Sequence, residues 1–207
     1  MNGDSLILTN QSTNNNLIDR FAAISNRGTR GFYNTQVSED GNVSLEPTNL
    51  VGPPTQEQKA FSDLMHGVIN DDNAVNIDLW EGADHSLTGN FDFNSIDIAD
   101  VEKFGNGPIV SAQGALIHEV AEQQAKQSGG LDSKDTALMA HSIGVMAENS
   151  VNGSTRLSVT EPLPSSNYTM DVFGVINGRV DMNFQKNGII GPVSIHVNEN
   201  NIKKVKQ

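Results

Sequence analysis

The sequence predicts an α+β fold in which two packed helices lie against a small, mostly antiparallel sheet. Two segments of helical length, residues 111–128 and 134–151, follow one another, and a glycine ends each. Short segments that alternate apolar and polar residues lie on either side of them, with Asp-Gly and Asn-Gly turns typical of hairpins. The chain has 207 residues, which is long enough for one domain with a sizeable core.

The beginning of the chain differs in composition from the rest. Residues 1–30 are polar and rich in Asn, with a loop expected at 11–16 and one short helix at 17–24. We therefore predict a polar N-terminal extension over residues 1–30. A single domain is expected to follow over residues 31–207.

Two elements are predicted in the first part of the domain. Residues 31–37 and 42–45 are expected to form a hairpin, because the Asp-Gly pair between them supplies the positive φ that its turn needs. A helix is expected directly after Thr55, a suitable N-cap. Gln58 stands three residues later and completes the pattern of a capping box.

The remaining strand candidates lie on both sides of the two central helices. Residues 74–80 alternate apolar and polar side chains, as a half-buried strand does. Residues 96–101 fit either a strand or a short helical turn. Near the C-terminus, residues 170–176 and 179–184 flank an Asn-Gly pair, which predicts a C-terminal β-hairpin region.

Charge and composition exclude several classes of function. The net charge of −12 and the pI of about 4.6 argue against binding to phosphate backbones, so no nucleic-acid partner is expected. The absence of cysteine excludes thiol catalysis, thiolate zinc sites and disulfides. No apolar run has the length of a membrane span, and the N-terminus lacks the pattern of a signal peptide.

The most informative stretch is His118-Glu119-Val120-Ala121-Glu122, in the first central helix. His118 and Glu122 are four residues apart, so a helix places both on one face, where both can hold one divalent ion. Glu119 lies about 100° further around the helix and can serve as a general base rather than a ligand. This resembles the H-E-x-x-H arrangement of zinc hydrolases, with Glu in the last position, which zinc also accepts as a ligand.

The second central helix adds His141, which the turn between the helices can bring to His118 and Glu122. Two imidazoles and one carboxylate are the protein ligands of a common class of catalytic zinc (Zn²⁺) site. Glu148 lies two turns beyond His141, and we expect it to orient a ligand imidazole through its second nitrogen. In the alternative, Glu148 is the third ligand and His141 lies near the substrate. Gly144 favours close packing of the two helices.

Two further features bear on a substrate. His85 lies in a loop after the strand predicted at 74–80 and is a candidate for substrate contact. The strand at 74–80 itself is expected to lie near the helix that carries His118, where it could pair with an extended peptide.

The order of these segments resembles the zincin-like metallopeptidase domains of bacterial polymorphic (Rhs-type) toxins, with H-E-x-x-E in place of H-E-x-x-H. The resemblance spans roughly residues 32–156. It implies a zincin-like fold and a zinc hydrolase that a dedicated secretion system secretes or delivers into a target cell. It also implies an immunity protein as a partner. The segments that carry it are Phe32-Tyr33 with Asp40-Gly41, Val75-Asn76-Ile77, 96–100, 116–122, Ala140-His141 and 147–150.

Together these features lead us to expect a zinc-dependent hydrolase, a peptidase acting on a protein or peptide as a toxin or effector domain. Glu119 is its expected general base, and His118, Glu122 and His141 are its expected ligands. The alternative is a non-catalytic binding or inhibitory module on a degenerate zincin scaffold, which has no need to retain zinc.

Overall fold

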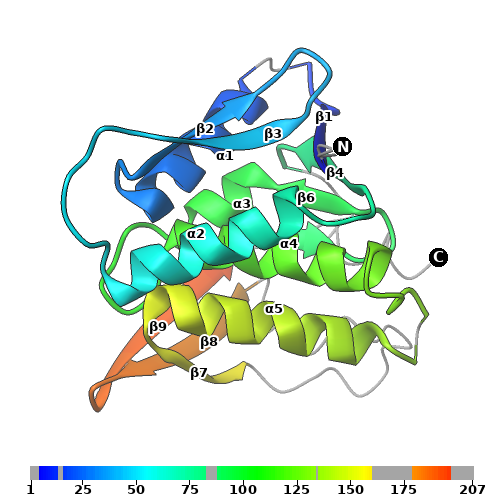
Figure 1. Cartoon of the computed structure of the whole chain (residues 1–207). Coiled ribbons are helices and arrows are strands. Elements are labelled where there is room, and N and C mark those ends of the chain that lie inside the picture. The colour runs from blue at the N-terminus through cyan, green and yellow to red at the C-terminus, as the bar shows by residue number, and fades with distance from the viewer. Residues whose placement is uncertain (1–4, 14–15, 83–87, 134, 160–178, 197–207) are drawn as a thin grey trace.

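The computed structural model describes residues 5–13, 16–82, 88–133, 135–159 and 179–196, and it confirms a mixed α+β fold (Figure 1). Three separate small sheets accompany the helices in the described part of the chain. None of the described helices has both the length and the apolar character that crossing a bilayer requires. The helices are α1 (Leu17–Thr29), α2 (Gln56–Ile69), α3 (Ile98–Glu102), α4 (Ala112–Gln127) and α5 (Ala137–Asn152).

The sheet beside the central helices is mixed. Its order is β1-β4-β6-β5, with β4 parallel to both β1 and β6 and only β5 antiparallel to its neighbour. This corrects the expectation of a mostly antiparallel sheet next to these helices. Parallel neighbours are joined by long crossovers, which leave no turn signal in the sequence. The strands are β1 (Leu6–Asn10), β4 (Val75–Trp80), β5 (Gly89–Asn90) and β6 (Ser95–Asp97).

Residues expected to form an N-terminal extension are instead part of the core. Strand β1 pairs with β4 along its whole length, and Leu6 is fully buried. Helix α1 buries Leu17, Phe21 and Ile24, whose spacing places them on one face against the sheet and α2. The polar residues of this segment therefore lie around a buried apolar stripe, and the described part of 1–30 belongs to the same fold.

The predicted hairpin and the helix after it are confirmed. Strands β2 (Tyr33–Val37) and β3 (Val43–Pro47) pair antiparallel, and Gly41 in their turn has a φ of +83°. Helix α2 begins with the expected capping box. The Thr55 hydroxyl accepts a hydrogen bond from the Gln58 backbone, and the Gln58 side chain accepts one from the Thr55 backbone.

The C-terminal part of the fold is an antiparallel sheet of β7 (Thr155–Val159), β8 (Arg179–Lys186) and β9 (Ile189–His196). Met182 and Phe184 of β8 are buried in the main core. Residues 179–184 therefore form a strand as predicted, but their described partners are β7 and β9. The expected partner segment, 170–176, lies outside the described residues.

Helices α4 and α5 lie side by side, and α5 runs back along α4 (Figure 1). Their bounds agree closely with the segments predicted at 111–128 and 134–151. Helix α4 also contacts β4 of the mixed sheet, so it lies between that sheet and α5. Leu116, Ile117 and Val120 are fully buried in this position, and most of the other residues of α4 are buried as well, polar ones included.

Candidate metal centre

Helix α4 carries three buried ionisable side chains in its middle. His118, Glu119 and Glu122 are only 5%, 6% and 2% exposed, in a helix that the hydroxyl of Ser111 caps at its N-terminus. Burying charged groups is costly unless they are paired or bind an ion. Two carboxylates and an imidazole at this depth therefore do not form a solvated helix face, and they must be paired or hold an ion.

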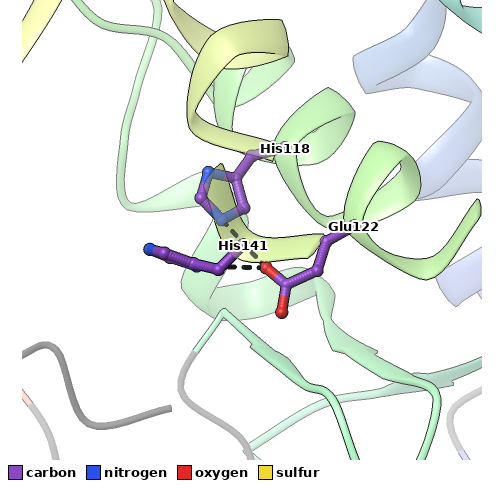
Figure 2. A group of neighbouring side chains, drawn as sticks. All are labelled: His118, Glu122 and His141. Atoms are coloured by element: carbon purple, nitrogen blue, oxygen red, sulfur yellow. Dashed lines mark hydrogen bonds and ion pairs between the residues drawn. The ribbon is translucent and has the colours of Figure 1, made fainter. Parts of the chain in front are cut away.

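The structure brings together His118, Glu122 and His141, as the sequence predicted (Figure 2). Oε2 of Glu122 lies 3.2 Å from Nε2 of His118 and 3.1 Å from Nδ1 of His141. The two imidazole rings meet edge to face, with 4.8 Å between their centroids. One potential ligand atom from each residue lies within 4.8 Å of the others, so this group could hold a metal ion.

Two observations test whether a divalent ion fits these residues. Oε1 of Glu122 is buried and has no hydrogen-bond partner among the described residues, so this carboxylate has unused capacity to bind. Ligand atoms around a tetrahedral zinc ion, with bonds of about 2.1 Å, are about 3.4 Å apart. The two distances from Glu122 to the imidazoles are close to that value. The donor set and these two distances therefore fit a divalent ion, and the group of three, which spans up to 4.8 Å, would have to draw together to hold it.

Glu148 lies on the other side of the His118 ring. Its Oε2 is 3.4 Å from Nδ1 of His118, while Nε2 of the same ring faces Glu122. The carboxylate is also 3.2 Å from Arg156. Of the two arrangements that the sequence left open, this geometry favours His141 as the third ligand and Glu148 as the group that orients His118.

Glu119 points toward strand β5 instead of joining the three candidate ligands. The hydroxyl of Thr88 donates a 2.6 Å hydrogen bond to its Oε1. Its Oε2 lies so close to Gly89 that a Cβ there would be 1.8 Å away. Sequence reasoning missed Thr88 and Gly89, because a strand of two residues has no periodicity to detect.

The sheet order also changes which strand can meet a substrate. Strand β4 has β1 on one side and β6 on the other, so it cannot pair with a peptide, contrary to expectation. Strand β5, which leads from Thr88, is the edge of the sheet among the described strands. His85, the candidate for substrate contact, lies outside the described residues.

Electrostatics within the site follow from burial and close pairing. Burial alone would lower the pKa of His118, but its contacts with Glu122 and Glu148 outweigh burial and raise it. Burial would raise the pKa of Glu122, yet the two histidines hold it below its usual range. Burial raises the pKa of Glu119, against the pull of His118 and with the repulsion of Glu122. The pKa values of the two carboxylates of α4 are thus shifted in opposite directions.

A comparison of the chain with protein-family models, with curated proteins and with solved structures finds no match.

Proposed function

We propose that this protein is a zinc-dependent hydrolase that cleaves peptide bonds. The observation that carries the proposal is the buried group of His118, Glu122 and His141, with Glu119 beside it on the same helix and excluded from it. Three side chains are thus available as ligands, and the carboxylate of Glu119 stays outside the group. A hydrolytic zinc site needs this division between ligands and a general base.

Zinc is the metal that we propose for this donor set. Two imidazole nitrogens and one carboxylate oxygen suit zinc, whereas magnesium and calcium prefer sites built from oxygen atoms alone. Three protein ligands leave a fourth tetrahedral position for water or substrate.

The residues around the site supply the remaining parts of the reaction. When bound, zinc supplies Lewis-acid activation of a water molecule and of the substrate carbonyl. Thr88 holds Oε1 of Glu119, and this carboxylate is the proposed acceptor of a proton from the water. The burial that raises the pKa of Glu119 makes this carboxylate a stronger base than an exposed one.

A protein or peptide is the proposed substrate class. Strand β5, directly after Thr88, is at the edge of the sheet among the described strands, and an extended chain can be bound along such an edge. The zincin-like assignment of the fold is likewise proposed from the H-E-x-x-E motif on α4 and the order of the elements. The toxin or effector role, delivery into a target cell and an immunity partner rest on the resemblance alone.

The experiment that tests the proposal combines metal content with turnover. Protein purified without chelator should contain one zinc ion per chain by elemental analysis, and His118→Ala should contain none. His66→Ala is the matched control, because His66 lies on α2 against Tyr33 and should not affect zinc content. Glu119→Gln should retain zinc while hydrolysis of a peptide mixture falls about 10²–10⁴-fold.

A second candidate function is a non-catalytic binding or inhibitory module in which the ion is structural. The depth of the site favours it, because structural zinc sites are closed and even the side chain of His141 is only 14% exposed. Wild-type protein that holds zinc but cleaves none of the peptides would decide for this module.

A further inference from the structure

A buried row of contacts leads from the candidate metal centre to the C-terminal sheet. Oε2 of Glu148 lies 3.4 Å from Nδ1 of His118 and 3.2 Å from Nη1 of Arg156. Arg156 belongs to β7. Its Nη2 lies 2.9 Å from the sulfur of Met182, and its guanidinium carbon is 5.9 Å from the centre of the Phe184 ring. The side chains of Glu148 and Arg156 are 1% and 9% exposed.

Stability alone does not account for the buried pair of Glu148 and Arg156. A buried arginine–carboxylate pair gains little net stability, because removing both charges from water offsets their attraction. Apolar side chains between Met182 and Phe184 would serve packing equally well. What an apolar pair cannot provide is a charged acceptor for Nδ1 of His118, and Glu148 turns the same oxygen to His118 and to Arg156.

The backbone also fixes Arg156 relative to Glu148. Helix α5 ends at Asn152, and the chain turns at once into β7. The backbone N–H of Arg156 donates a 2.8 Å hydrogen bond to the side chain of Asn149, the residue after Glu148. The guanidinium is therefore held to the helix that carries Glu148 through both its main chain and its side chain.

We propose that Arg156 is a positioning residue for the metal centre and acts through Glu148. Its guanidinium fixes the carboxylate that accepts the Nδ1–H of His118. This hydrogen bond sets the tautomer and ring orientation in which Nε2 faces Glu122 and the ion. The inference rests on the proposed function only in requiring that the site bind zinc.

Zinc affinity, measured by competition with a chromogenic chelator, tests this role without any activity assay. Arg156→Met retains a long apolar side chain against Met182 and Phe184, and it should weaken zinc binding about 10–100-fold. Arg20→Met is the matched control. It removes an arginine paired with Glu81 and Glu102 and changes the net charge equally, so zinc affinity should stay within about twofold.

A double-mutant cycle shows whether Arg156 acts through Glu148. In a Glu148→Gln background the carboxylate is absent, so adding Arg156→Met should cause no further loss of zinc affinity. Arg156→Lys keeps the charge but offers one nitrogen in place of the guanidinium fork, so its affinity should lie between those of wild type and Arg156→Met.

Each outcome decides a separate point. Equal zinc affinities of Arg156→Met and Arg20→Met overturn the inference and leave the proposed function standing. An equal loss with and without Glu148 also overturns it. Wild-type protein that binds no zinc overturns the proposed function and the inference together. If circular dichroism shows that Arg156→Met is unfolded, Arg156→Lys is compared with Arg20→Lys. Weaker zinc binding by Arg156→Lys supports the inference, and equal binding refutes it.

Discussion

Gly144 of α5 lies directly against His118 of α4. A Cβ added to Gly144 would stand 2.8 Å from the backbone oxygen of His118 and 2.9 Å from Cδ2 of its imidazole. Both distances are too short for real side chains, so only glycine lets α5 approach α4 this closely. The position of His141 relative to His118 and Glu122 therefore depends on a residue that has no side chain.

Gly144→Ala should disturb this helix contact. Forcing a methyl group into a packed interface typically costs about 1–3 kcal/mol, so the free energy of unfolding in urea should fall by that amount. Zinc content should fall as well. Gly67→Ala is the matched control: Gly67 lies in α2 with open space around its Cβ position, and alanine there should stabilise by up to about 1 kcal/mol. Equal stability changes in the two variants would contradict the proposed role of Gly144.

Gly89→Ala should act on catalysis and spare the metal. The new Cβ would meet Oε2 of Glu119 at 1.8 Å, and the end of that side chain can move aside. A general base displaced by about 1 Å can lower the rate about 10²-fold, so peptide hydrolysis should fall by that factor with zinc retained. Thr88→Val should also lower it by removing the hydroxyl donor, whereas Thr88→Ser should restore it. Full activity in Gly89→Ala would exclude Glu119 as the base.

Removing zinc should destabilise the fold. An ion that binds only the folded chain adds about 2.7 kcal/mol when its free concentration is 100 times its Kd. Melting of the wild type, followed by circular dichroism, should therefore shift to lower temperature when a chelator is added and return with zinc. His118→Ala should melt at one temperature under both conditions. A wild-type melting temperature that ignores zinc would argue against the site.

Asp100 should make stability depend on pH. Burial in α3, with repulsion from Asp97, raises the pKa of Asp100 to about 6 despite its pairing with Lys103. The folded-state pKa lies above the ordinary value of 3.8, so protonated Asp100 favours folding at low pH, and this contribution is lost as the pH rises through about 6.

Asp100→Asn stays neutral at every pH. Between about pH 4 and pH 7.5 its free energy of unfolding should therefore rise relative to wild type by about 1–2 kcal/mol, after allowance for solvent screening. Urea titrations at both pH values measure this difference. Asp63→Asn, on the exposed face of α2, is the control for removing one carboxylate. If the free energy of unfolding of Asp100→Asn fell relative to wild type as the pH rises, folding would not raise the pKa of Asp100.

Local signals predicted much of the helical structure and the grouping of the ligands. The spacing of His118 and Glu122 on one helix fixes their separation, and Gly144 marks the close contact that brings His141 to them. These relationships lie within two consecutive helices. Helix periodicity and the position of the connection between α4 and α5 were therefore sufficient to predict that His118, Glu122 and His141 come together.

Relationships between distant segments were not predictable in the same way. The apolar residues Leu6 and Leu8 were a signal for β1 that the Asn-rich composition of the first residues obscured. Arg156 carries no local mark of its pairing with Glu148, because a side chain on a strand can face either side of its sheet. Thr88 precedes β5, and the order of the strands in the sheet, which the sequence does not reveal, brings it to Glu119.

The location of all three candidate ligands on consecutive helices also bears on the order of folding. Helices α4 and α5 are neighbours in the chain, whereas the mixed sheet is complete only when Leu6 of β1 meets Val75 of β4. Joining nearby segments loses less chain entropy and happens sooner than joining distant ones. The helical pair can thus assemble its ligand group while the N-terminal strand is still unattached, and the ion would then serve as an early nucleus around which the rest of the chain condenses.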